Sequence, residues 1–284
     1  MKFRKDAQAM LQLTILDASG NVKQGKNDYD AGPKPLHNTG TDSVFVATQK
    51  MTFTEGDVIR LHVDQVPGYY VVQFDETLAP TIVYLTVPTW DYTVTLTPNA
   101  QDARPEAAFK TARHYLSARR ATRAEITSER DWALNPHDQP LVDGIFPHAH
   151  ANVETRNDAT FFAQNAIDGV WASSLHGEYP YMSWGINQDP HAAMTVELGR
   201  PVTISRVGVV LRADFPHDSW WQRGVLTFSD GTNEVLTFRK TGEPQYFDIQ
   251  PHTATAVTFH DLQRADDSSP FPALTSLQLY GRNA

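Results

Sequence analysis

Short runs of alternating hydrophobic and polar residues recur along the first third of the chain. Turn signals such as Asp17-Ala18-Ser19-Gly20 and Glu55-Gly56-Asp57 separate them. Evenly spaced short strands with such turns are typical of antiparallel sandwiches and jelly rolls. Residues 1–98 are therefore predicted to form a β-sandwich domain, apart from a surface excursion at 21–42. Its strands are expected at 11–16, 43–48, 51–53, 58–63, 69–74, 81–87 and 92–96.

The pattern changes over residues 99–134, where alanine, arginine and glutamate increase and β-branched residues become fewer. The run Thr122-Arg123-Ala124-Glu125 has the spacing of a helical capping box, and Pro105 suits the first turn of another helix. These features predict a partly helical connector. Its basic residues are interpreted as a solvated face that pairs with nearby acids, with a phosphate site as the alternative. They are Arg113, Arg119, Arg120 and Arg123.

From residue 135 onward the pattern of short strands returns, and its most distinctive stretch is R-A-D-F-P-H-D-S-W-W at 212–221. An apolar run precedes it and a second strand follows it, which predicts a loop at one end of a sheet. Aromatic rings cover the C–H face of a sugar, and charged groups bond its hydroxyls. In the alternative interpretation Trp220 and Trp221 plug the sandwich. Neighbouring strand residues face opposite sides, so at least one ring then lies in the core.

Five segments of the second half follow one another in an order that resembles the discoidin-like domain, the coagulation-factor C-type or galactose-binding-like fold. They include A-x-x-A-I-D-G within residues 157–173, Trp184-Gly185, the segments 195–204 and 273–281, and Phe228-Ser229-Asp230-Gly231. The resemblance covers about half of the chain and implies a jelly roll over residues 135–284. The whole protein is thus predicted to be all-β, with two antiparallel β-sandwich domains joined by the connector. This fold serves glycans, lipids and proteins alike.

A similarity to family 32 carbohydrate-binding modules implies a ligand held by loops at one end of the jelly roll. The second domain is therefore predicted to bind a saccharide without catalysing a reaction. The candidate contacts are Arg212, Asp214, His217, Trp220 and Trp221 in one loop, and His176, Tyr181 and Trp184 in the neighbouring loop at 176–188.

Two other classes of function are kept as alternatives. Exposed tryptophans are common in protein interfaces, so the protein is alternatively an interaction module or a homo-oligomer. A glycoside-processing enzyme would use Asp214 and Asp218 beside His217, because glycosidases need two carboxylates. The sequence carries none of the familiar hydrolase, phosphate-loop or dinucleotide motifs.

The resemblance also implies a structural calcium ion near Asp168, which belongs to the A-I-D-G turn. The closing strand has Ser276 and Gln278 where the family has an acidic residue, and calcium prefers several oxygen ligands. No other cofactor is predicted, and calcium is kept as a hypothesis. His148 and His150, two residues apart on one side of a strand, are interpreted as a structural or ligand-facing pair, with metal binding as the alternative.

Composition narrows the choice of partners. The chain has 24 basic and 33 acidic residues and a net charge of −9, which argues against a broad nucleic-acid-binding face. It has no cysteine, which excludes disulfides and thiolate chemistry. No membrane span and no signal peptide are visible, so a cytoplasmic location is expected, or secretion if the chain was trimmed.

Overall fold

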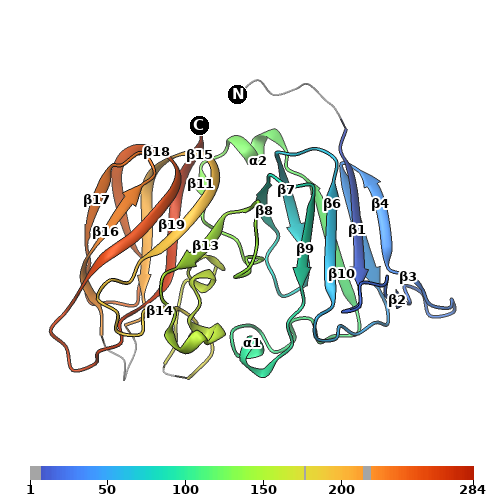
Figure 1. The fold of residues 1–284 in the computed structure, drawn as a ribbon, viewed down its shortest axis with the longest axis horizontal. Helices are drawn as coiled ribbons and strands as arrows, with labels where there is room; N and C mark the ends of the chain where they lie inside the picture. The colour runs from blue at the N-terminus through green and yellow to red at the C-terminus, as the bar shows by residue number, and fades with distance from the viewer. Residues whose placement is uncertain (1–7, 176, 214–218) are drawn as a thin grey trace. The chain divides into compact units, whose positions relative to one another are not determined.

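The computed structural model describes residues 8–175, 177–213 and 219–284, and it is built from antiparallel β-strands with only short helices (Figure 1). The all-β class predicted from the sequence is confirmed. The chain divides into two compact units. Unit 1 comprises residues 1–122 and 143–145, and unit 2 comprises residues 123–142 and 146–284.

Unit 1 contains two antiparallel sheets. The four-stranded sheet has the order β4 (His37–Thr41), β1 (Met10–Leu16), β6 (Val58–Val63) and β9 (Thr89–Thr93). The five-stranded sheet has the order β12 (Ile145–Phe146), β8 (Thr81–Leu85), β7 (Gly68–Gln73), β10 (His114–Arg120) and β5 (Ser43–Thr48). A two-stranded ribbon joins β2 (Gln24–Gly25) and β3 (Lys34–Pro35).

The core of unit 1 follows the alternation that the sequence predicts. On β6 every second residue is buried, and each of these residues faces a buried partner on β1, for example Leu61 opposite Leu13. Trp90 and Tyr70 are buried in this core, and the Phe74 and Trp90 rings lie 4.8 Å apart between centroids. The excursion expected at 21–42 is wrong in part, because its last residues form the edge strand β4.

The predicted helical connector is also only partly correct. Residues 99–134 contain the short helices α1 (Pro98–Asp102) and α2 (Arg123–Thr127), but between them β10 runs inside the five-stranded sheet. Buried residues alternate along β10, but the arginines at its end make this alternation hard to recognise in the sequence. Arg120 lies 3.4 Å from Asp42, which agrees with a solvated, acid-paired face.

Unit 2 is one continuous antiparallel sheet with two strands off its main path. The order is β11 (Arg130–Asp131), β19 (Ala273–Asn283), β15 (Met194–Leu211), β18 (Gln245–Arg264), β16 (Trp221–Phe228) and β17 (Asn233–Thr237). β13 (His148–Ala151) pairs with β15, and β14 (Trp184–Gly185) pairs with β19. The single-turn helices η1 (Thr155–Asn157), η2 (Ala159–Phe161) and η3 (Ala163–Ile167) precede β14.

The histidine pair on β13 has separate partners. The His148 Nδ1 lies 2.8 Å from an Asp138 carboxylate oxygen, and the other oxygen accepts the Ala149 N–H. The more exposed His150 lies 3.4 Å from Glu197. The Asp138 carboxylate thus ties the 138–149 segment together, which supports the structural interpretation of His148.

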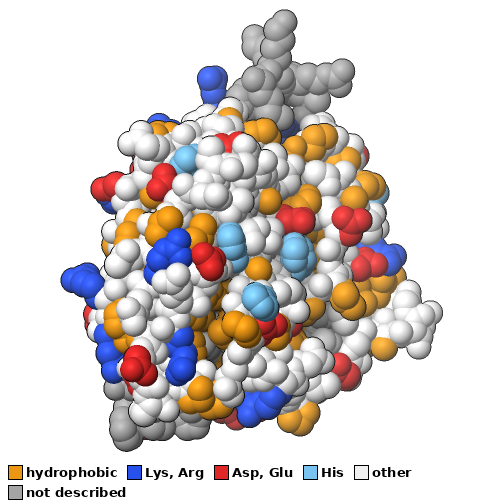
Figure 2. Space-filling view, turned by 60° about the vertical axis from the view of Figure 1, so that its left-hand side comes forward, with side chains coloured by type: hydrophobic (Ala, Val, Ile, Leu, Met, Phe, Trp, Pro, Cys, Tyr) orange, Lys and Arg blue, Asp and Glu red, His pale blue; other side chains and the backbone are white. Residues whose placement is uncertain are grey.

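Over the face drawn in Figure 2, basic and acidic side chains are intermixed, and several histidines lie close together. Within the described ranges, no helix is both long and apolar enough to cross a membrane.

Candidate functional site

Several strands of unit 2 end or begin at one end of its sheet, the lower end in Figure 1. β14 and the last residue of β15 both pair with Leu274 on β19, and Trp221 at the start of β16 pairs with Arg264 at the end of β18. The segments that follow or precede these strands therefore meet. We call this region the loop end, and its described residues are 168–175, 177–190, 212–213, 219–221 and 264–273.

The two loops selected from the sequence do meet here. The Arg212 N–H donates to the Ala273 carbonyl at 2.9 Å, and the Arg212 guanidinium lies 5.8 Å from the centre of the Tyr181 ring. The Trp184 and Trp221 ring centroids are 6.3 Å apart. Three of these candidate contacts, however, do not face water.

Trp184 and Trp221 both have 0% exposed surface, and Arg212 is also buried. The Trp184 indole N–H donates to the Val153 carbonyl, and the Trp221 ring packs edge-on against Phe259. Because these two indoles lie inside the sandwich, neither offers an exposed stacking surface for a sugar. Trp220, the residue before β16, is half-buried.

Tyr181 is half-buried as well. The other three candidates, His176, Asp214 and His217, lie outside the described residues. Three further rings of unit 2, which the sequence did not single out, are exposed to solvent: Trp171 at 55%, Tyr179 at 51% and Phe271 at 44%. Trp171 and Tyr179 follow the A-I-D-G turn, and Phe271 lies between two prolines in a serine- and aspartate-rich loop. The turn and the proline-, serine- and aspartate-rich loop are the sequence features that could have indicated exposed rings at these positions.

A pocket of about 290 Å³ opens at the loop end. Trp221, Leu262, Pro270 and Pro272 form part of its apolar wall. Its polar lining residues are Gln188, Asp189 and Arg264. This combination of a mostly apolar wall with a few polar groups is typical of small-ligand sites.

The polar groups of the pocket are held by their own loops. Arg264 donates to the Ser269 carbonyl at 3.0 Å, which fixes its guanidinium against the 265–272 loop. Asp189 accepts the His191 N–H at 2.8 Å. The Trp221 Nε1 is buried and has no hydrogen-bond partner among the described residues. An unpaired buried donor costs about 1–3 kcal/mol.

One wall of the pocket is a tight turn with an uncommon backbone. Asn187 and Gln188 have φ values of 48° and 60°, and the Asp189 N–H donates to the Ile186 carbonyl at 2.9 Å. Asparagine tolerates this left-handed region, whereas glutamine adopts it rarely. Such conformations concentrate at binding sites, where the surrounding structure holds them in place.

Asp168 lies in the A-I-D-G turn, at the start of the loop that leads to β14. Its carboxylate accepts the Val170 N–H at 2.7 Å, and burial raises its pKa to about 8 despite that bond. Within the described residues it belongs to no group of three His, Asp or Glu side chains close enough to share an ion. A calcium ion there would take most of its ligands from carbonyl, amide and water oxygens.

Comparisons with known proteins give structural neighbours only. No family model matches the chain, and no curated protein matches it. The solved structures that it resembles include carbohydrate-binding modules and a lectin domain.

Three of these structures illustrate the likeness. Chitosan-binding module 1 from a chitosanase/glucanase of Paenibacillus sp. IK-5 is 19% identical, with a TM-score of 0.37 over 53% of this chain and 98% of that chain. The family 32 module of C. perfringens NanJ, solved with galactose, is 16% identical, with a TM-score of 0.36 over 46% and 91%. A Streptococcus pneumoniae fucose-binding module is 12% identical, with a TM-score of 0.38 over 54% and 98%.

Proposed function

We propose that unit 2 is a non-catalytic carbohydrate-binding module whose saccharide enters the pocket at the loop end. The observation that carries the proposal is the pocket lining itself. The Asp189 carboxylate and the Arg264 guanidinium suit the paired hydroxyls of a sugar. A volume of about 290 Å³ suits one sugar ring better than a long chain.

The exposed rings in the loops of unit 2 support the same class of ligand. Trp171, Tyr179 and Phe271 present exposed aromatic surface. Trp220, the residue before Trp221, is half-buried and presents part of its ring as well. Rings of this kind cover the C–H faces of further sugar units. Their number favours an oligosaccharide whose end occupies the pocket.

The lining argues against a glycoside-processing enzyme. Such enzymes place two carboxylic acids on either side of the scissile bond. Among the described residues that line the pocket, Asp189 is the one carboxylate. The acids of the enzyme alternative, Asp214 and Asp218, lie outside the described residues. Turnover of aryl glycosides by the full chain would support the enzyme instead.

Binding is expected to depend on the polar lining of the pocket. Asp189→Asn and Arg264→Gln should each weaken saccharide binding at least tenfold, because each removes a charge-assisted hydrogen bond of about 1.5–3 kcal/mol. Isothermal titration against monosaccharides and oligosaccharides, preceded by a glycan array, measures this. Arg223→Gln is the matched control, because Arg223 pairs with Asp261 at 3.1 Å and does not line the pocket.

Two results would count against sugar binding. One is the absence of binding to any saccharide at millimolar concentration. The other is binding that both pocket variants leave unchanged. Self-association is the competing function, and analytical ultracentrifugation distinguishes it. A stable dimer that dissociates on Trp171→Ala or Phe271→Ala would assign the exposed rings to a protein interface.

A further inference from the structure

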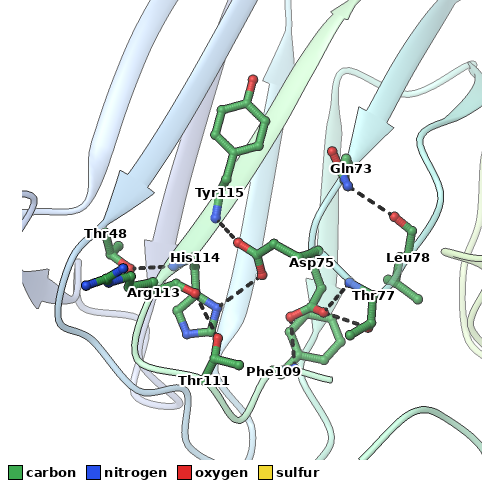
Figure 3. A network of polar contacts seen from close by, with 11 residues as sticks. Thr48, Gln73, Asp75, Thr77, Leu78, Phe109, Thr111, Arg113, His114 and Tyr115 are labelled. Carbon is green, nitrogen blue, oxygen red and sulfur yellow. Dashed lines mark hydrogen bonds and ion pairs between the residues drawn. The ribbon is translucent and has the colours of Figure 1, made fainter. Parts of the chain in front are cut away.

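A compact group of metal-ligating side chains lies in unit 1, separate from the proposed sugar site. Asp75 and Glu76 follow the end of β7, and His114 begins the neighbouring strand β10. Ser117 pairs with Gln73 in the antiparallel register, so continuing along both strands brings His114 opposite Glu76. One ligand atom of each residue lies within 4.8 Å of those of the other two. We call these three residues the β7–β10 cluster (Figure 3).

The imidazole of His114 is the unexplained member. Its side chain has no exposed surface, and the ring packs edge-on against Phe53 at 4.8 Å between centroids. Neither ring nitrogen has a hydrogen-bond partner among the described residues. The Nδ1 atom points toward Glu76, at 3.8 Å from its Oε2. Two unsatisfied buried nitrogens are costly, so a further group is expected to bind at least one of them.

The carboxylates are oriented by the backbone and keep capacity for a cation. Asp75 accepts the Thr77 N–H and hydroxyl through Oδ1 and the Phe109 N–H through Oδ2 at 2.8 Å. Glu76 accepts the Tyr115 N–H through Oε1. Neither carboxylate forms an ion pair with a lysine or arginine of the described residues. Each oxygen has two lone-pair directions, so Asp75 Oδ2 has one left for a cation and Glu76 Oε2 has both.

We propose that the β7–β10 cluster binds a divalent transition-metal ion of the zinc type. The ligands are the His114 Nδ1, a Glu76 carboxylate oxygen and Asp75 Oδ2, and water completes the coordination. Imidazole with carboxylate suits zinc, whereas calcium and magnesium prefer oxygen alone. Zinc ligands at about 2.1 Å lie about 3.4 Å apart in a tetrahedral site, so the cluster needs a small contraction. Glu76, 44% exposed, is free to make it, while backbone bonds hold Asp75 in place.

The test uses the full chain, freed of metal by chelation and titrated with zinc chloride in a calorimeter. We expect one zinc ion to bind at micromolar concentration and to raise the melting temperature. Glu76→Gln should weaken that binding at least tenfold while the amide oxygen still accepts the Tyr115 N–H. Cobalt substitution gives a second readout, because a ring nitrogen ligand changes the visible absorption of cobalt in the native protein.

The matched control is Glu55→Gln. Glu55 is also an exposed glutamate of unit 1 that accepts a backbone N–H, from Leu96, but it lies outside the cluster. His114→Gln removes the nitrogen ligand. If this variant of a buried residue does not fold, Glu76→Gln still tests the proposal. The proposal is overturned by the absence of zinc binding at micromolar concentration. Equal zinc affinity in the Glu76→Gln and Glu55→Gln variants would also overturn it.

Discussion

Trp221→Ala is expected to lower the free energy of unfolding by about 3–5 kcal/mol, the range of large-to-small substitutions in well-packed cores. The indole has no exposed surface and packs between the Trp184 and Phe259 rings. Removing it leaves a cavity that the paired strands β16 and β18 cannot close. Urea denaturation followed by far-ultraviolet circular dichroism measures the loss.

The neighbouring residue provides the control. Trp220 is half-buried, and its backbone carbonyl accepts the Ala265 N–H, a bond that any side chain keeps. Trp220→Ala should therefore change the unfolding free energy by less than about 1 kcal/mol. Equal losses for the two variants would contradict the assignment of one ring to the core and the other to the surface. The folded Trp220→Ala variant also serves to test the contribution of that ring to sugar binding.

Local patterns predicted most strands of unit 1, because one face of each sheet is buried and the alternation is clear. β5 and β6 have the predicted bounds. β4 and β10 were missed for a physical reason. β4 is an edge strand made of exposed polar residues, and β10 ends in arginines that keep their charges at the surface. Neither strand is marked by hydrophobic residues at both ends.

The position of the candidate site was predictable, but its surface was not. Turn signals and the resemblance placed the 176–188 and 212–221 loops at one end of the jelly roll, where the structure brings them together. Which ring of an adjacent pair faces the core depends on where the strand begins, and β16 begins at Trp221. The pocket itself combines Gln188 with Arg264, which are far apart in sequence, so no local pattern contains it.

The second large effect concerns Asp168 and pH. The pKa of an aspartate in an unfolded chain is about 3.9, whereas burial raises that of Asp168 to about 8. The folded state therefore binds this proton more tightly, and its stability falls as pH rises from about 4 to 8. Between pH 5 and pH 8 the loss approaches 3–4 kcal/mol as an upper value, at 1.36 kcal/mol for each pH unit.

Asp168→Asn should remove this loss, because the amide stays neutral and its oxygen still accepts the Val170 N–H. In the presence of a chelator, the variant is expected to match the wild-type protein at pH 5 and to melt several degrees higher at pH 8. Thermal melts across this pH range measure the difference. Asp230→Asn is the control, because exposed Asp230 also accepts a backbone N–H two residues ahead, but its hydrogen bonds lower its pKa.

Bound calcium would reverse the expected effect of Asp168→Asn on the melting temperature at pH 8. An ion bound to the carboxylate would stabilise its charged form, so added calcium would raise the melting temperature of the wild-type protein at pH 8 and not that of Asp168→Asn. Among the described residues, Asp168 belongs to no group of three His, Asp or Glu side chains close enough to share an ion. We therefore expect calcium to leave the melting temperatures of both proteins unchanged. A variant less stable than the wild-type protein at pH 8, in calcium but not in chelator, would instead establish the cation site that the family resemblance implies.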